Sequence, residues 1–285
     1  DFCLSRGLGD VYKRQIILWV KIMSVFLNLS APWQALIATL FTFLITSAGA
    51  SIVFFFKKVN KTLMDAMLAF ASGVMMAASY FSLLAPAISG AESLNLNPWL
   101  ITTIGFLIGG LLLYLSDKVF DKVLVKTSES SKKKRIILLI SSITIHNIPE
   151  GLAIGVAFGS TLYHIEGATI LAAMGLALGI GLQNFPEGSA VSLPLRREGM
   201  SRKKSFIIGA LSGIVEPIAG VVGAILALKV RTILPFLLSF AAGAMIYVVV
   251  EELIPESQTN EKKDLMAIFS IIGFCVMMIL DVALG

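Results

Sequence analysis

The chain has 285 residues, of which 56% are hydrophobic and 14% are charged, and its mean hydropathy is +0.87. Soluble domains carry roughly 25% charged residues, so this composition excludes an ordinary soluble domain and predicts an integral membrane protein. The net charge of +5 does not indicate a nucleic-acid partner, because the lysines and arginines fall in short gaps between apolar runs.

Residues 1 to 22 differ from the rest of the chain. This segment has neither the basic region nor the small-residue cleavage site of a signal peptide. We expect it to be a non-native or disordered N-terminal extension, with Met23 as the true start. Residues 23 to 285 are expected to form a single transmembrane domain.

Apolar runs of roughly 20 residues recur from Met23 onward, and a helix of that length crosses about 30 Å of hydrocarbon. Turn and charge signals separate eight such runs, which predict an all-α integral membrane fold with eight transmembrane helices. We expect these helices near residues 33–56, 63–88, 98–117, 135–160, 166–195, 205–228, 231–254 and 265–284.

The distribution of positive charge predicts the orientation of the chain. The gaps after the first, third, fifth and seventh runs are rich in lysine and arginine, whereas the alternate gaps hold only Lys229 and Arg231. By the positive-inside rule the basic gaps are cytoplasmic, so both termini face outward. The polar segment 118–135 is expected to be a solvated cytoplasmic loop that sets this orientation.

The fourth run carries the segment ITIHNIPEGLAIG at residues 143–155. His146 and Glu150 are four residues apart, which places them about 40° from each other on one helix face, with Asn147 about 100° away from His146. Pro149 removes one backbone donor and so frees a carbonyl group. A charged side chain at membrane depth costs a few kcal/mol on insertion scales, so this polar group is expected to be functional.

The fifth run repeats this design in IGLQNFPEGSAVS at residues 180–192, where Gln183, Asn184 and Glu187 each follow their counterparts by 37 positions. Consecutive spans are antiparallel, so an inverted pseudo-two-fold relates the two motifs and predicts that they face each other near the midplane. Glu216, which precedes Pro217 in the sixth run, adds a third carboxylate.

This set of donors predicts a divalent cation as the ligand. Three buried carboxylates repel one another and stay protonated unless cations neutralise them. Nitrogen and oxygen donors without thiolates fit zinc, iron(II), manganese or cobalt, and the imidazole argues against a pure magnesium or calcium site. Glu150 and Glu187 are each central to a motif and are placed to bridge two ions.

Other side chains are weaker candidates for a transport pathway. Methionine usually fills a core, and carboxylates at helix ends are ordinary. The pathway candidates are Asp65, Met75, Ser82, Asp117, Glu251 and Glu252.

With HNIPEG and QNFPEG in consecutive helices, the sequence resembles the ZIP family of divalent metal transporters, in particular its prokaryotic branch. The likeness runs from about residue 33 to the C-terminus and includes FASGVMMAASYFSLLAPAI, which looks like the second helix of the family. The resemblance implies a 3+2+3 inverted-repeat arrangement, elevator-like movement, and a homodimer in the plasma membrane of a prokaryote. The implied activity is uptake of Zn²⁺, and also of Fe²⁺, Mn²⁺, Co²⁺ or Cd²⁺, into the cytoplasm.

The resemblance also implies a binuclear centre between the fourth and fifth helices. Its first site comprises His146, Glu150, Gln183 and Glu187, and its second comprises Asn147, Glu150, Asn184, Glu187 and Glu216. Two positions depart from the pattern of some relatives. Asn184 stands where an aspartate can occur, which makes the second site less negative, and Glu251 stands where a histidine can occur.

Three other functions remain open on the residues alone. A cation exchanger coupled to H⁺ or Na⁺ also uses inverted repeats, and a passive channel would carry the same polar residues. An intramembrane metalloenzyme is disfavoured because the chain lacks an HExxH motif. We therefore expect no enzyme activity and no catalytic cofactor, with metal ions and the lipid bilayer as partners.

Overall fold

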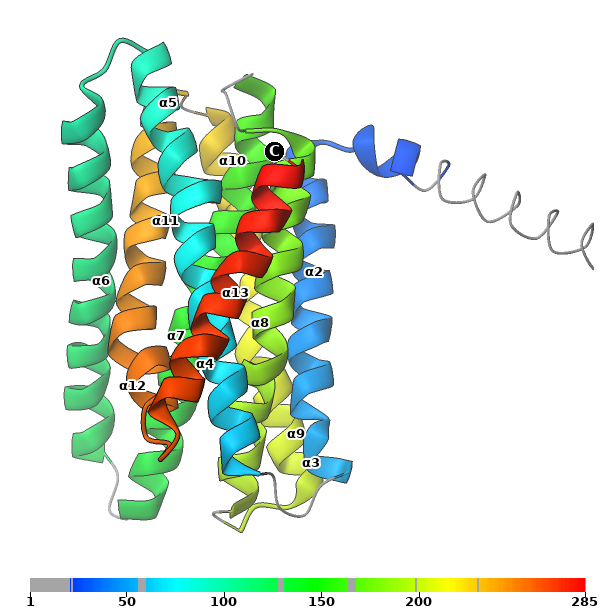
Figure 1. Cartoon of the computed structure of the whole chain (residues 1–285), viewed down its shortest axis with the longest axis vertical. Helices are drawn as coiled ribbons and strands as arrows, with labels where there is room; N and C mark the ends of the chain where they lie inside the picture. The colour runs from blue at the N-terminus through cyan, green and yellow to red at the C-terminus, as the bar shows by residue number, and fades with distance from the viewer. Residues whose placement is uncertain are drawn as a thin grey trace, which may run out of the picture.

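The computed structural model describes residues 21, 23–55, 60–127, 131–163, 168–197, 199–229 and 231–284. Nearly all of the predicted N-terminal extension lies outside these residues. The described part folds into helices without a strand (Figure 1). The first half holds α2 (Ala31–Ala50), α3 (Ile52–Phe55), α4 (Lys61–Ala78), η1 (Ser79–Leu84), α5 (Ala85–Ser93) and α6 (Pro98–Thr127). The second half holds α7 (Ser131–Ser160), η2 (Thr161–Tyr163), α8 (Ile170–Arg197), α9 (Arg202–Leu211), η3 (Ser212–Ile214), α10 (Val215–Lys229), η4 (Arg231–Ile233), α11 (Leu234–Val248), η5 (Val249–Leu253), α12 (Ile254–Ser257) and α13 (Lys263–Leu284).

Within the described ranges, six helical segments are long and apolar enough to cross a membrane, which supports an integral membrane protein. These segments are Ala31–Phe55, Lys61–Ser93, Pro98–Ser116, Arg202–Leu228, Leu234–Ser257 and Lys263–Ala283. The helices α7 and α8 are not among them, although they have 30 and 28 residues. The count of eight spans therefore stays a prediction.

The polar segment 118–135 is helical where it is described, so the prediction of a loop over this whole range is wrong. Helix α6 continues to Thr127 and α7 begins at Ser131, with residues 128–130 outside the described part. The physical reason is that no glycine or proline occurs between residues 111 and 135, so nothing in the sequence stops either helix. Asp117 consequently lies within α6 rather than at its end.

Proline has different effects in the motif helices and in the sixth predicted run. Helix α7 continues through Pro149, and α8 continues through Pro186. The sixth run instead changes to a 3₁₀ turn at Ser212–Ile214, immediately before Glu216 and Pro217. Because Pro217 has no N–H to donate one turn back, this break leaves backbone carbonyl groups available to side chains.

Two π-helical turns occupy matching places in the two halves of the chain. Turn η1 lies between α4 and α5, and η5 lies between α11 and α12. Each begins six residues after a similar tetrapeptide, FASG at 70–73 and FAAG at 240–243. Turns of this kind occur often at functional sites. The match indicates an internal repeat, and η5 carries Glu251 and Glu252, which lie within a continuous helical segment rather than at its end.

Close backbone contacts pair α2 with α8, α7 with α10, α4 with α13 and α6 with α11, and we treat these pairs as two groups. The first group is α2, α7, α8, α9 and α10, and the second is α4, α5, α6, α11, α12 and α13. A Cβ atom at Gly188 of α8 would lie 2.9 Å from the Ala50 backbone nitrogen of the first group, and one at Gly109 of α6 would lie 3.0 Å from the Ala244 backbone nitrogen of the second. Such contacts need glycine because only glycine lets helix backbones approach this closely.

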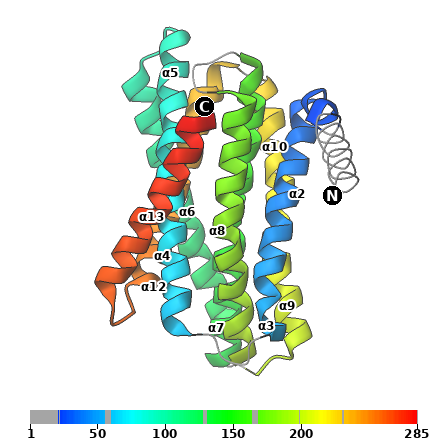
Figure 2. The ribbon, with the colours of Figure 1, turned by 45° about the vertical axis from the view of Figure 1, so that its right-hand side comes forward.

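Side chains fill the boundary between these two groups. Gly179 of α8 faces the second group, where a Cβ atom would meet the flexible side chain of Met277 in α13. Figures 1 and 2 show α6 and α2 on opposite sides of the bundle, with the start of α2 and the end of α13 at the same end.

Candidate metal centre

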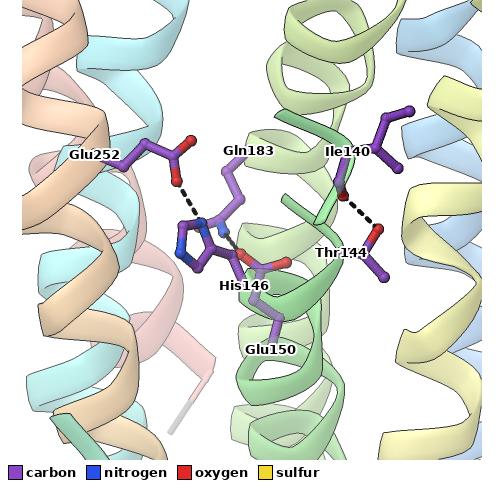
Figure 3. Close-up of polar contacts among 6 residues, drawn as sticks. All are labelled: Ile140, Thr144, His146, Glu150, Gln183 and Glu252. Carbon is purple, nitrogen blue, oxygen red and sulfur yellow. Dashed lines mark hydrogen bonds and ion pairs between the residues drawn. The ribbon is translucent and has the colours of Figure 1, made fainter. Parts of the chain in front are cut away.

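The seven predicted metal ligands are all buried, and none is more than 7% exposed. Helix α7 supplies His146, Asn147 and Glu150, α8 supplies Gln183, Asn184 and Glu187, and α10 supplies Glu216. A direct contact joins the two motifs, because Gln183 Nε2 donates a hydrogen bond of 2.5 Å to Glu150 Oε1 (Figure 3). The structure thus brings the two sequence motifs together as the repeat predicted.

A second polar contact centres on Glu216 at the start of α10. Asn184 Nδ2 lies 2.9 Å from both carboxylate oxygens of Glu216, and the Thr42 hydroxyl of α2 donates to Oε2. Asn147 Nδ2 donates at 2.9 Å to the carbonyl oxygen of Ser212 in the 3₁₀ turn. The Asn147 amide therefore finds its backbone acceptor in the 3₁₀ turn that precedes α10.

Four oxygen atoms in this cluster are buried without a hydrogen-bond partner. They are Asn147 Oδ1, Glu150 Oε2, Gln183 Oε1 and Asn184 Oδ1. Such atoms are rare in folded proteins, where buried acceptors are nearly always paired. Oxygen lone pairs of carboxylates and amides are donors for divalent cations. Their position on both α7 and α8 is consistent with a cation bound between the helices.

The cluster is not a preformed cage of charged ligands. Within the described part of the chain, no three His, Cys, Asp or Glu side chains are grouped closely enough to hold a metal ion. The candidate ligands contact their neighbours instead, as Glu150 does with Gln183 and Glu216 with Asn184. Each of these two carboxylates therefore has a neutral amide as its hydrogen-bond donor.

His146 forms an ion pair through Nδ1 with the carboxylate of Glu252 in η5 (Figure 3). This contact crosses from α7 of the first helix group to the second group. The sequence placed Glu252 only among the weaker pathway candidates. Its distance from His146 along the chain left no spacing signal for the contact.

A cavity of about 630 Å³ extends from the candidate ligands to the end of the bundle where α4 begins. His146 and Glu187 lie at its inner part, and Lys61 and Glu256 also line it. Three pathway candidates contribute to its wall, namely Asp65, Glu251 and Glu252. Asp65 is buried there and accepts a 2.8 Å hydrogen bond from Asn260 Nδ2.

The other pathway candidates lie elsewhere. Met75 is fully buried in the main hydrophobic core. The Ser82 hydroxyl donates a hydrogen bond of 2.6 Å to Asp281 Oδ1, and Asp281 did not figure in the sequence prediction. The Asp117 side chain is outside the described part, although its backbone belongs to α6.

Sequence reasoning missed Thr42, which contacts Glu216 directly. A signal was present, because Thr39, Thr42 and Thr46 recur in the first apolar run at spacings of three and four and share a helix face. All three are buried. Threonines in a membrane helix often bond to their own backbone, so this pattern alone does not point to a carboxylate.

These features define an integral membrane protein with a buried centre of carboxylate, amide and imidazole groups supplied by α7, α8 and α10. A family model described as ZIP Zinc transporter matches residues 125–281. The zinc transporter ZIP11 of Homo sapiens is 38% identical over an alignment 338 residues long, gaps included. The alignment covers 90% of this chain and 98% of that protein. Zinc transporter ZIPB of Bordetella bronchiseptica is 32% identical, with 85% and 79% covered, and zinc transporter ZupT of Chlorobaculum parvum is 32% identical, with 86% and 95% covered.

The chain therefore belongs to the ZIP zinc transporter family, whose members are metal transporters and not enzymes. This confirms the family indicated by HNIPEG and QNFPEG and the prediction that the protein is not an enzyme. The relatives named above come from one animal and two bacteria. Assignment to a prokaryotic branch consequently stays a prediction.

Proposed function

We propose that this protein carries Zn²⁺ across a bilayer into the cytoplasm, through a binuclear centre between α7 and α8. Fe²⁺, Mn²⁺, Co²⁺ and Cd²⁺ are further candidate substrates. The main supporting observation is the pair of facing motifs, joined by the Gln183–Glu150 hydrogen bond and bearing four buried oxygens without hydrogen-bond partners. A bound cation would supply the electrostatic partner that these four oxygens lack.

The ligands divide into two overlapping sets. The first site takes His146, Glu150, Gln183 and Glu187, and the second takes Asn147, Glu150, Asn184, Glu187 and Glu216. Glu150 and Glu187 belong to both sets and bridge the ions. Two divalent ions among three carboxylates bring the buried charge close to neutral, which removes most of the cost of placing these groups in a low-dielectric region.

The proposed direction of transport rests on the cavity and on the positions of the basic residues. The cavity reaches from Glu187 to the end of the bundle at Lys61. Arg202, Lys203 and Lys204 begin α9 at that same end (Figure 1). By the positive-inside rule this end is cytoplasmic, so the cavity is the route by which an ion leaves. Both termini then face outward, in the plasma membrane of a prokaryote.

Elevator-like movement fits the division into two helix groups. Backbone contacts at Gly188 and Gly109 hold helices of the same group together, whereas the boundary at Gly179 meets the flexible side chain of Met277. Rigid groups with a side-chain boundary slide more easily than an evenly interlocked bundle. We propose that the first group carries the ion past the second, which acts as the scaffold of a homodimer.

An eight-span, 3+2+3 arrangement accounts for the helix pairs. The pairing of α2 with α8 corresponds to that of α10 with α7, and the pairing of α4 with α13 corresponds to that of α11 with α6. This pattern is expected if two repeats of three spans flank α7 and α8. The matching turns η1 and η5 are consistent with the same repeat.

Competition between metals during uptake tests the proposed substrate. We expect Zn²⁺ to enter proteoliposomes in a saturable manner and an excess of a competing substrate ion to reduce its initial rate. Uptake is measured with and without a pH gradient and with opposing Na⁺, and the metal content of the purified protein is determined in parallel. Uptake that requires an opposing Na⁺ gradient would favour the exchanger instead, and uptake that does not saturate would favour a channel.

Replacement of Gln183 by leucine tests the link between the motifs. The variant removes both a donor to Glu150 and an amide oxygen, so we expect zinc affinity to fall on the order of tenfold, as is usual when a partner of a metal ligand is lost. Binding is measured by zinc titration of the purified protein. Gln34→Leu is the matched control, because this buried glutamine donates to the Phe26 carbonyl, remote from the motifs. Equal affinities in both variants would contradict the assigned role.

A further inference from the structure

The two halves of the candidate centre differ in how their carboxylates are satisfied. Glu150 accepts one hydrogen bond at Oε1, and its other oxygen is buried without a hydrogen-bond partner. Glu216 accepts hydrogen bonds at both oxygens, from the Asn184 amide and from the Thr42 hydroxyl. The chain's own neutral donors therefore satisfy Glu216, whereas Glu150 still has an unpaired acceptor.

The donor from α2 is fixed in place by burial. Thr42 and Glu216 are both 0% exposed, so neither side chain has water as an alternative partner. Hydrogen bonds to a charged acceptor are among the stronger ones in proteins, especially where the surroundings are dry. A metal ion that uses Glu216 as a ligand must compete with these donors for the carboxylate lone pairs.

The Thr42 hydroxyl also has a second acceptor within reach. Its Oγ1 lies 3.0 Å from the carbonyl oxygen of Thr39 in its own helix. A hydroxyl group carries one proton, so it donates to Glu216 or to Thr39 but not fully to both. Rotation of the hydroxyl hydrogen about the Cβ–Oγ1 bond, from one acceptor to the other, would withdraw the donor from the Glu216 carboxylate without leaving a buried donor unpaired.

We propose that Thr42 is a positioning residue that makes occupation of the second metal site conditional. While Thr42 donates to Glu216, the protein holds one divalent ion at the first site, and the second ion binds only when this bond is given up. The inference rests on the proposed binuclear centre and assigns to this chain an order of filling. Asn184 takes part, since its amide nitrogen faces the carboxylate.

The test is the stoichiometry of zinc binding, which does not depend on transport. Purified protein is dialysed to equilibrium against buffered zinc, and bound metal is measured by elemental analysis. Wild type should bind two ions in two separated steps. Thr42→Val keeps the shape of the side chain and removes the donor, so the second step should move to zinc concentrations lower by on the order of tenfold, the worth of one hydrogen bond to a charged group.

Four further variants make the result specific. Thr42→Ser restores the donor and should behave as wild type, whereas Thr42→Ala lacks the donor and should behave as Thr42→Val even if the valine variant folds poorly. Thr39→Val removes a buried hydroxyl that bonds within α2, to Ala35, and should leave both steps unchanged. Glu216→Gln combined with Thr42→Val should abolish the second step.

Several outcomes would overturn the inference. These are two ions of equal affinity in wild type, superimposable titrations of wild type and Thr42→Val, or a shift in Thr42→Ser as large as in Thr42→Val. Absence of any zinc binding in wild type would instead overturn the proposed function itself. The two failures are therefore distinguishable in one experiment.

Discussion

Alanine in place of Glu187 should reduce zinc uptake into proteoliposomes by about 100-fold or more, at the upper end of what loss of a metal-site residue costs. Glu187 is buried, lines the cavity and belongs to both proposed ligand sets. The variant is therefore expected to weaken the binding of both proposed ions at once. The measurement is the initial rate of radioactive zinc uptake at concentrations below saturation.

The control for this experiment is Glu92→Ala. Glu92 is an exposed carboxylate in α5, at the end of the bundle away from the cavity (Figure 1). The Glu92→Ala variant should transport zinc at the wild-type rate. This result would show that the loss of uptake in Glu187→Ala comes from the site and not from the removal of a negative charge in general. If Glu187→Ala kept wild-type uptake, the assignment of the metal centre would be wrong.

The second large effect is expected in the second helix group, where α6 packs against α11. A Cβ atom at Gly109 would lie 2.8 Å from the carbonyl carbon of Phe240 and 3.0 Å from the Ala244 nitrogen. Overpacking of this kind costs about 1–3 kcal/mol. That cost exceeds the gain of roughly 1 kcal/mol that alanine brings to a helix over glycine. Gly109→Ala should therefore destabilise the protein.

The neighbouring glycine supplies the matched control. A Cβ atom at Gly110 would lie 3.4 Å from the Gly243 carbonyl oxygen and 3.9 Å from Tyr247 Cβ, which are ordinary contact distances. Gly110→Ala should thus be neutral or slightly stabilising. Both variants are compared by thermal denaturation in detergent, and equal melting temperatures would contradict the close approach of α6 and α11.

The clustering of the two polar motifs could be predicted from the sequence, because the relevant information is local. A spacing of four places His146 and Glu150 on one helix face, and the same spacing repeats at Gln183 and Glu187. Neighbouring antiparallel spans then leave few ways to arrange two polar motifs other than facing each other. The burial of all seven candidates and the contact between Gln183 and Glu150 agree with that reasoning.

Helix ends were harder to predict, because charge and secondary structure follow different rules. The basic segment 118–135 signals solvent, but lysine and serine are compatible with helix, so α6 and α7 extend into it. Conversely, the break at Ser212–Ile214 occurs within an apolar run that was expected to be one helix. We attribute this break to Pro217, which has no N–H to donate to the backbone one turn earlier.

The sequence by itself indicated the family, through the likeness of HNIPEG and QNFPEG to its motifs. It also determined the candidate ligands and the class of ion they suit, because residue chemistry and helical spacing carry both. Only the tertiary structure decided which side chains those ligands contact. Thr42 reaches Glu216 from α2, and Glu252 reaches His146 from η5. Helix α10 of the sixth run packs against α2 of the first, and α11 of the seventh run packs against α7 of the fourth. No periodicity within one helix encodes which face of a distant helix will lie against it.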